Sequence, residues 1–203
     1  MLLKGLFSGG SQRTKSRFTR ELPQTTAGFW ASYFSNLFGF TRKVSSWGGA
    51  TVSQLEPAFL KGSKAFTLGS YIMGGSSIEA DPDNVIFQHE YGHYLQSQEM
   101  GWSYLFKVAI PSLKSAAGDG MHCFFKTEQD ANMRSLIYMS ENVEEFYRTK
   151  DQLDKDKGWN FLKNPLDPNS ERVRGRYYDV RDASVRSDLI KSLSLTGGLW
   201  YIR

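Results

Sequence analysis

Apolar and polar residues follow two different periods along this chain. Between residue 28 and Gly39, apolar side chains recur at the spacing of one helix face, and this glycine is a natural helix end. From about residue 44 to residue 75, the pattern changes to β-branched residues and short alternations, of which Ala65 to Ile72 is the clearest. We therefore expect one helix and then two or three strands that are joined by turns, one of them at Gly48-Gly49.

The next element is the best-defined helix of the sequence. It is predicted from about Pro82 to Met100, because Asp81 is a good N-cap and proline suits the first helical position. Asp83 lies at the positive end of the helix dipole, which favours an acidic residue. Gly101 is the expected C-terminal stop.

Two further helices are expected before the chain becomes loop-rich. One lies around residues 104–115, where Pro111 either kinks the helix or marks its start. The other is capped by Thr127 and extends from Glu128 to about Tyr147, with a break expected near Ser140.

The length of 203 residues suits one domain, and the order of elements indicates the α+β class. Residues 1–22 are rich in serine, lysine and arginine, and we expect them to form a basic, flexible arm. Residues 23–150 hold the predicted helices and strands and form the core. Residues 151–203 are expected to pack on that core as a C-terminal extension.

Composition excludes several classes of protein. Hydrophobic residues make up 40% of the chain and aromatic residues 14%, so a packed core is expected rather than intrinsic disorder. No apolar stretch approaches the ~20 residues that cross a bilayer, and we expect no membrane span. The single cysteine, Cys123, cannot form an internal disulfide, which excludes a disulfide-stapled scaffold and a zinc ribbon with several cysteines.

Charge and the N-terminus bear on partners and location. The net charge is +4, with basic clusters near the start of the chain and around residues 172–186. We interpret both clusters as solvated surface charge and expect no nucleic-acid partner. The apolar stretch at residues 1–7 is too short for the core of a classical signal peptide. We therefore expect a cytoplasmic protein, or one exported by a specialised secretion route without a cleaved leader.

The motif that points to chemistry is His89-Glu90-Tyr91-Gly92-His93, an H-E-x-x-H sequence inside the best-defined helix. Residues four apart lie on one helix face, so both imidazoles can reach a single ion. Zinc suits two neutral imidazoles and one further protein ligand, with a fourth position left for water. Glu90 follows the first ligand and can take the proton of that water as a general base. The sequence therefore predicts one zinc ion per chain.

The third ligand decides the class of zinc site. The extended metzincin motif would need glycine at position 96 and histidine at position 99, but the chain has Gln96 and Glu99. The alternative is a glutamate from a later helix, commonly within an E-x-x-A-D pattern. Residues 128–132 match this pattern except that asparagine replaces the final aspartate. We expect Glu128 to complete the site and Asn132, one turn later, to hold a ligand imidazole by a hydrogen bond.

Three other residues compete with that glutamate. His122 lies in the loop before the third helix and is a zinc ligand in principle, as are Cys123 and Asp130. Four protein ligands would favour a closed structural site, because catalytic zinc keeps one position open. His122 is also a candidate for stabilising the oxyanion of a tetrahedral intermediate.

The sequence from His89 to His93, followed by Glu128, resembles the short gluzincin-type zinc metallopeptidases. A longer stretch, from about residue 48 to residue 146, is similar to zincin-like modules at the C-termini of bacterial RHS-repeat proteins, where variable toxin domains are attached. The segments that carry this likeness are Phe66–Ile72, Ala80–Pro82, Phe87–Gln98 and Thr127–Asn132.

This resemblance implies a zincin-like fold, in which a small mixed or antiparallel sheet packs on the motif helix and on a second, ligand-bearing helix. It also implies use as a secreted effector or toxin domain, with a cognate inhibitor or immunity protein as a partner. The fold further implies a strand with an exposed edge beside the metal. Ala65 to Ile72 is the best candidate, so Phe66, Leu68 and Ser70 would border a bound peptide; an ordinary core strand is the alternative.

Together, these features predict a zinc-dependent metallopeptidase that hydrolyses peptide bonds in a peptide or protein substrate. His89, His93 and Glu128 would bind the zinc, and Glu90 would be the general base. The alternative is a non-catalytic binding module on a zincin scaffold, whose zinc is structural.

Overall fold

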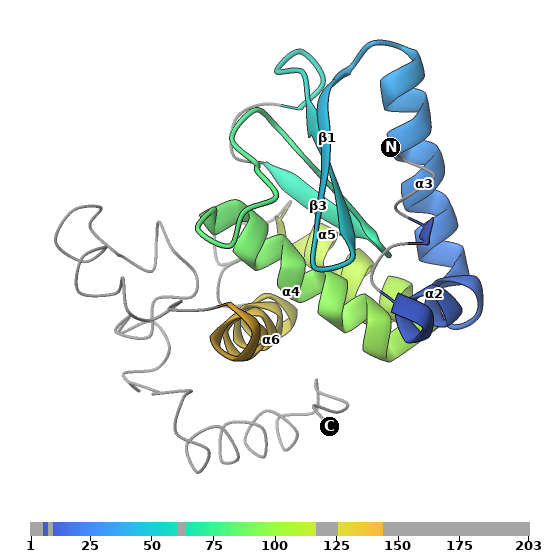
Figure 1. Ribbon diagram of the computed structural model, residues 1–203, viewed down its shortest axis with the longest axis vertical. Coiled ribbons are helices and arrows are strands. Elements are labelled where there is room, and N and C mark those ends of the chain that lie inside the picture. The colour runs from blue at the N-terminus through green and yellow to red at the C-terminus, as the bar shows by residue number, and fades with distance from the viewer. Residues whose placement is uncertain (1–5, 8–9, 61–63, 117–125, 144–203) are drawn as a thin grey trace, which may run out of the picture.

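The computed structural model describes residues 6–7, 10–60, 64–116 and 126–143 (Figure 1). Over these ranges the protein is of the α+β class, as predicted, with a small mixed sheet and several helices. No helix in this part of the chain is both long and apolar enough to cross a membrane. His122, Cys123 and the predicted extension over residues 151–203 lie outside the described residues.

Four strands form the sheet, in the order β1-β2-β4-β3. Strands β1 (Thr41–Trp47) and β2 (Ala50–Leu55) form an antiparallel hairpin, and β2 runs parallel to β4 (Tyr71–Gly74). Strand β3 (Ala65–Leu68) pairs antiparallel with β4 and is an edge of the sheet among the strands that the structure describes. The first hairpin turns at Gly48-Gly49, as predicted, with positive φ angles at both glycines.

The alternating segment from Ala65 to Ile72 forms two strands rather than the single strand that the sequence predicts. Gly69 has a φ of 58°, and the chain turns there and at Ser70 between β3 and β4. A side chain at Gly69 would also collide with the backbone of Thr25. The glycine therefore serves both the turn and the close approach of the helix that contains Thr25.

Helix α4 (Val85–Met100) carries the H-E-x-x-H motif. It begins later than predicted: Asn84 is the N-cap, and its side chain accepts a hydrogen bond from the backbone N–H of Phe87. Asp81 instead accepts a hydrogen bond within the turn that precedes the helix. The helix ends at Gly101, as predicted, where φ is 57°.

Helix α6 (Lys126–Asn142) packs against α4 (Figure 1) and continues through the position of the predicted break. The last residues of the predicted helix, beyond residue 143, are not among those described. Between α4 and α6, the chain forms a 3-10 turn (Gly101–Ser103), a π-helical turn (Leu105–Ala109) and helix α5 (Ile110–Ala116). Pro111 therefore lies in the first turn of α5, where proline is tolerated.

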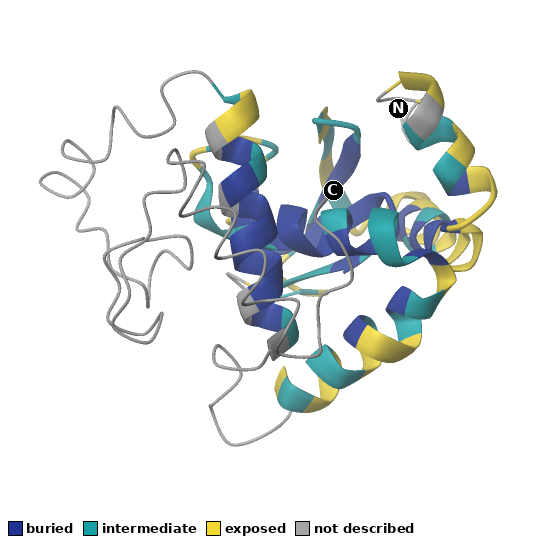
Figure 2. Ribbon diagram, turned by 90° about the horizontal axis from the view of Figure 1, so that it is seen from below, coloured by how far each residue is buried: buried dark blue, intermediate teal, exposed yellow. Residues whose placement is uncertain are grey.

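The core lies between one face of the sheet and helices α4 and α6. Figure 2 shows both helices as largely buried. Strands and helices together contribute the apolar side chains of this cluster, which include Val52, Ile72, Phe87, Tyr91, Met133 and Ile137. This packing holds α4 against the sheet and α6 against α4, which positions the two helices that carry the motif residues.

Helix α3 (Leu22–Leu37) contains most of the predicted helix over residues 28–39 and covers the opposite face of the sheet. Ser32 Oγ lies 2.5 Å from Ser53 Oγ of β2, whereas Val52, next to Ser53, faces the core. The buried residues of α3 are small or polar: Gln24, Thr25, Gly28, Ser32 and Ser35. Most of the large apolar residues that predict this helix therefore lie on its exposed side: Trp30, Tyr33, Phe34 and Leu37.

The N-terminal segment differs from the flexible arm that the sequence predicts. Residues Gly10–Phe18 form helix α2, in which Arg17 is only 1% exposed. Its Nε donates to Ser70 Oγ at 2.6 Å. Arg13 donates to the carbonyl of Gly48 and to the hydroxyl of Tyr138. Two of the basic residues thus tie this segment to the hairpin turns and to α6.

Candidate metal centre

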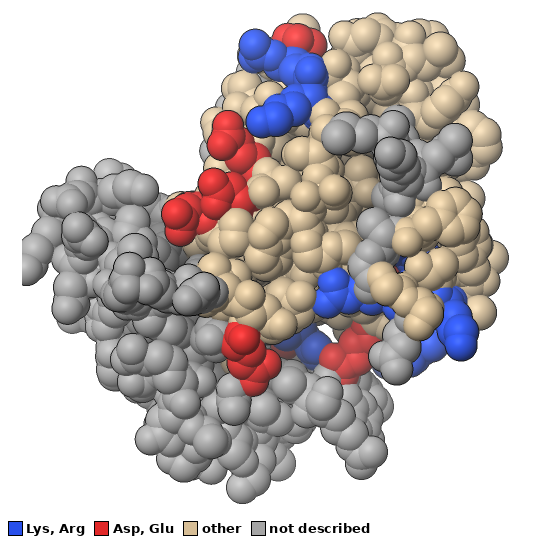
Figure 3. Space-filling model, in the orientation of Figure 1, with Lys and Arg blue, Asp and Glu red and all other residues tan. Residues whose placement is uncertain are grey.

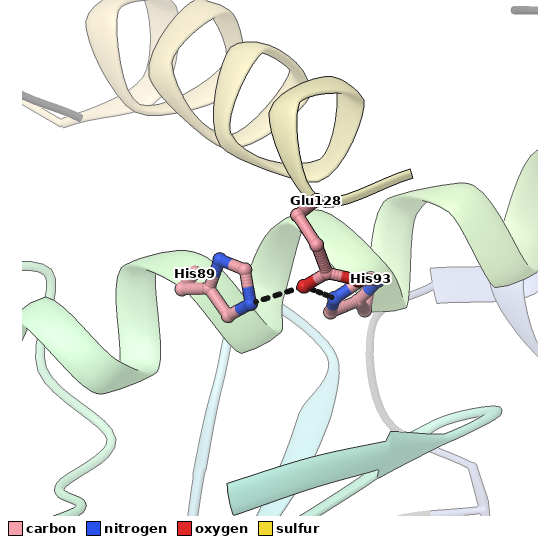
Figure 4. A group of neighbouring side chains, drawn as sticks. All are labelled: His89, His93 and Glu128. Atoms are coloured by element: carbon pink, nitrogen blue, oxygen red, sulfur yellow. Dashed lines mark hydrogen bonds and ion pairs between the residues drawn. The ribbon is translucent and has the colours of Figure 1, made fainter. Parts of the chain in front are cut away.

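Three side chains from two helices converge at one point (Figure 4). His89 and His93 lie one turn apart on α4, and Glu128 lies in the first turn of α6. Glu128 Oε2 is 3.1 Å from His89 Nε2 and 3.2 Å from His93 Nε2. Ligand atoms of all three residues lie within 4.8 Å of one another, so this group could hold a metal ion. These are the three residues that the sequence predicts as ligands.

Close packing of α4 and α6 brings Glu128 to the histidines. Gly92 lies between the two histidines in sequence and faces Ala131 of α6. The backbones approach so closely that a side chain on Gly92 would overlap the Ala131 carbonyl. Gly92 and Ala131 are the small residues of the two motifs. Their size lets the helices approach closely enough for the three ligand candidates to meet.

Each imidazole is oriented by a hydrogen bond between its Nδ1 atom and a side-chain amide oxygen. His89 Nδ1 lies 2.7 Å from Asn132 Oδ1, and His93 Nδ1 lies 2.7 Å from Gln96 Oε1. Because an amide oxygen can only accept, each Nδ1 carries the proton and donates it. Both Nε2 atoms therefore point toward Glu128, and each offers a lone pair to a cation when its imidazole is neutral. Asn132 makes the type of contact that its position predicts.

Gln96 was not predicted as a support for His93. Its Nε2 donates to the Thr127 carbonyl at 2.9 Å and to Asp130 Oδ2 at 2.5 Å, which fixes the amide with its oxygen toward the imidazole. The signal was present in the sequence, because residues three apart on a helix share a face.

Asp130 belongs to this supporting network and not to the converging ligands. It forms an ion pair at 2.9 Å with Arg134, and Arg134 also pairs with Glu99 at 2.5 Å. The carboxylate of Asp130 is therefore occupied by its interactions with Gln96 and Arg134. Of the three competitors for the third ligand, Asp130 is the one that the structure describes, and it lies outside the cluster of ligand atoms.

Glu90, the predicted general base, is buried and held by a residue that the sequence analysis missed. Thr67 Oγ1 donates to Glu90 Oε2 at 2.7 Å. The carbonyl of Thr67 in turn accepts a hydrogen bond of 3.2 Å from the hydroxyl of Tyr104. Burial raises the pKa of Tyr104 well above its usual value, and the charges of Glu90 and Glu128 raise it further, so the phenol keeps its proton.

The three predicted substrate-edge residues have different positions. Phe66 and Leu68 lie on edge strand β3, but Thr67 is the residue whose side chain contacts Glu90. Side chains alternate along a strand, so Phe66 and Leu68 point to the other face. Ser70 lies in the β3–β4 turn, is fully buried and accepts a hydrogen bond from Arg17. The prediction for Ser70 is therefore wrong, because the residue is not available to a substrate.

The electrostatics of the cluster favour a positive charge among the three groups. Burial by itself would lower the pKa of His93, but the hydrogen bond and the charge of Glu128 outweigh it and raise the pKa to about 9. Burial would likewise raise the pKa of Glu128, but its hydrogen bonds with His89 and His93 hold it well below the usual range. A carboxylate that stays ionised between two imidazoles is a suitable place for a cation.

The donor set narrows the choice of cation. Two imidazole nitrogens and one carboxylate oxygen suit divalent transition metals such as zinc, whereas calcium and magnesium prefer oxygen ligands alone. His89 keeps 22% of its side chain exposed, compared with 6% for His93 and 1% for Glu128. An incoming molecule would therefore approach the site from the side of His89.

No family model, curated protein or solved structure matches this chain. The function of the protein is therefore inferred from the residues of the site and from their geometry.

Proposed function

We propose that the protein is a zinc-dependent metallopeptidase with a gluzincin-like centre on a zincin-like fold. The observation that carries this proposal is the position of Glu128 Oε2, within 3.2 Å of the Nε2 atoms of both motif histidines. Glu90, a second carboxylate, follows His89 directly and lies buried beside this cluster. Two carboxylates in different environments suit two roles, one as a ligand and one as a base.

The proposed ion is zinc, one per chain, held by His89 Nε2, His93 Nε2 and the Glu128 carboxylate. Bound there, zinc supplies Lewis acidity, which lowers the pKa of a water molecule and polarises a substrate carbonyl. Asn132 and Gln96 keep the imidazoles in place by holding their Nδ1 protons.

Glu90 is the proposed general base. Its carboxylate takes a proton from the attacking water and later gives that proton to the amine nitrogen of the leaving group. The hydrogen bond from Thr67 to Glu90 Oε2 fixes the orientation of the carboxylate during both transfers. Tyr104 supports this arrangement, because its hydroxyl donates a hydrogen bond to the backbone carbonyl of Thr67.

A peptide is the proposed substrate because of the position of strand β3. No strand in the described part of the chain pairs with its outer edge, and Thr67 of this strand contacts the general base. An extended peptide can add to such an edge through backbone hydrogen bonds, which would bring a peptide bond beside Glu90. The likeness to zincin-like modules of RHS-repeat proteins supports a further role as a secreted effector domain with a cognate inhibitor protein.

Hydrolysis of an unstructured protein tests the proposal. Zinc-loaded protein is incubated with fluorescently labelled casein, and turnover is compared with that of Glu90→Gln and of a control, Glu79→Gln, at an exposed carboxylate. We expect Glu90→Gln to keep its zinc and to lose about 100-fold or more of the rate, with the control unchanged. Zinc binding without any cleavage by the wild type would contradict the peptidase and favour a binding module with a structural zinc.

A further inference from the structure

Helix α3 and the residues that directly follow it expose a continuous strip of large apolar side chains. This aromatic ridge consists of Trp30, Tyr33, Phe34, Leu37, Phe38 and Phe40, which are between 38% and 65% exposed. Its rings contact one another in series: the centroids of Trp30 and Phe34 are 5.5 Å apart, those of Phe34 and Phe38 6.3 Å, and those of Phe38 and Phe40 6.4 Å. Connected exposed apolar surface of this kind marks an interaction site more often than singly scattered residues do.

The ridge is a consequence of how α3 is built. Its small and polar residues face the sheet, where Ser32 contacts Ser53 and Gly28 packs against Leu68. The chain also carries no charged residue from Leu22 to Thr41. The outer side of this helix is therefore uncharged along its whole length and mostly apolar, whereas a surface helix usually turns its polar side outward.

Exposed basic residues lie at both ends of the ridge. Lys15 and Arg20 precede α3, and Arg42 and Lys43 follow the ridge at the start of β1. Figure 3 shows basic side chains near the two ends of the tan surface around α3, with acidic side chains beside them and along the left edge of the molecule. Glu21 is fully buried, and Glu56 forms an ion pair with Arg42 at 3.4 Å, so the charges of Glu56 and Arg42 offset each other. The exposed basic residues that remain are Lys15, Arg20 and Lys43. The surroundings of the ridge are thus positive.

We propose that the aromatic ridge docks the protein onto an anionic lipid surface. Tryptophan and tyrosine are enriched at the depth of the lipid headgroups, and phenylalanine and leucine reach the acyl boundary below them. Lysine and arginine around such a strip are attracted to anionic headgroups. The 16 residues of α3 span about 24 Å, so the helix would lie in the plane of the membrane surface. This inference is independent of the proposed peptidase activity.

A second copy of the chain fits the ridge less well. Pairing of α3 with α3 in a parallel arrangement would place Lys15 and Arg20 against the same residues of the other copy. An antiparallel pairing would place them against Lys43, since Glu56 offsets the charge of Arg42. Both arrangements bring like charges together, which disfavours association. An anionic partner removes this repulsion.

Sedimentation with lipid vesicles tests the proposal. Protein is mixed with vesicles of phosphatidylcholine and phosphatidylglycerol, or of phosphatidylcholine alone, and the bound fraction is measured. We expect binding to the anionic vesicles that weakens with added salt. The double variant Trp30→Ser/Phe34→Ser should lower the partition coefficient by at least about tenfold. A matched control, Trp102→Ser/Phe106→Ser, changes two side chains that are each 65% exposed and should leave binding unchanged.

A charge variant separates the contribution of the basic residues to vesicle binding from the contribution of the ridge side chains. Lys15→Glu/Lys43→Glu keeps every aromatic ring and should weaken binding to the anionic vesicles; circular dichroism verifies that each variant is folded. The proposal is overturned if the wild type binds neither vesicle, if the charge variant binds as well as the wild type, or if the control loses as much binding as the ridge variant. A different result would assign the ridge to a second copy of the chain: the wild type binds no vesicles but self-associates in sedimentation velocity, and the ridge variant does not self-associate.

Discussion

A side chain on Gly92 would overlap the carbonyl oxygen of Ala131, so α4 and α6 touch at the point where their metal-ligand candidates meet. Gly92 lies between His89 and His93, and Ala131 lies one turn after Glu128. The distance of 3.1–3.2 Å from the glutamate to both imidazoles depends on this contact. The same helix packing therefore serves the core and the candidate site.

The first prediction concerns Gly92→Ala. In an open helix this change would stabilise the protein by about 0.5–1 kcal/mol, because alanine is the better helix former. Here the added methyl group must separate α4 from α6, and we expect a destabilisation of about 1–3 kcal/mol together with reduced metal binding. Urea unfolding and metal content measure the two effects. A gain in stability would show that the helices do not touch at this position.

Thr67→Val tests the support of the general base. The variant keeps the shape of the side chain but removes the hydroxyl that donates to Glu90. We expect normal zinc content and a loss of about ten- to 100-fold in kcat, because the carboxylate is no longer held in place.

The matched control for this variant is Thr51→Val in strand β2. The hydroxyl of Thr51 is buried without a hydrogen-bond partner, so its removal should leave both kcat and stability intact. Equal kcat values for Thr67→Val and wild type would remove Thr67 from the proposed mechanism.

Two substitutions of Asn132 separate orientation from charge. Asn132→Leu removes the acceptor for His89 Nδ1 and should weaken zinc binding by about 10- to 100-fold. Asn132→Asp keeps an acceptor and adds a negative charge that makes the imidazole more basic, so its affinity should equal or exceed that of the wild type. Titration against a chromogenic zinc chelator measures both. If Asn132→Leu binds zinc as tightly as the wild type, this hydrogen bond does not support the site.

The raised pKa of Glu21, a residue away from the metal centre, predicts that the stability of the fold depends on pH. Burial raises the pKa of Glu21, although a hydrogen bond from Ser97 and the charges of Arg17 and Arg20 oppose the shift. A raised pKa means that the folded state binds the proton more tightly than the unfolded state. This contribution to stability is complete below the unfolded pKa and is lost as the pH rises through the folded pKa.

Glu21→Gln cannot ionise and should therefore gain stability relative to wild type as the pH rises from about 4 to 7. Urea unfolding of both proteins across this range measures the difference, in which contributions from other carboxyl groups cancel. A difference that does not vary with pH would show that Glu21 has an ordinary pKa in the folded protein.

The sequence predicts that His89, His93 and Glu128 come together, because local rules decide their geometry. The i, i+4 spacing of His89 and His93 and the pattern from Glu128 to Asn132 each depend on one helix, and one close contact joins the two helices. Thr67 could not be found in this way. It is 23 residues from Glu90, and only the placement of an edge strand against α4 brings the two side chains together.

The fold was predicted less completely, and α3 shows why. Its apolar periodicity identifies a helix but does not determine which side is buried, because that depends on the surface it covers. The covered face of the sheet presents Ser53, so the small and polar side of α3 packs there. The basic N-terminal segment is a similar case, since Arg17 can be buried because Ser70, the first hairpin and the carbonyl of Leu6 offer it hydrogen-bond acceptors.

His89, His93 and Glu128 are the residues that we propose to hold one metal ion. The most direct measurement is the zinc content per chain, by elemental analysis after metal-free purification and incubation with zinc, in the wild type, in Glu128→Ala and in the exposed control Glu79→Ala. We predict one zinc in the wild type and in the control, and much less than one in Glu128→Ala. No zinc in the wild type, or one zinc in a folded Glu128→Ala protein, would contradict the account.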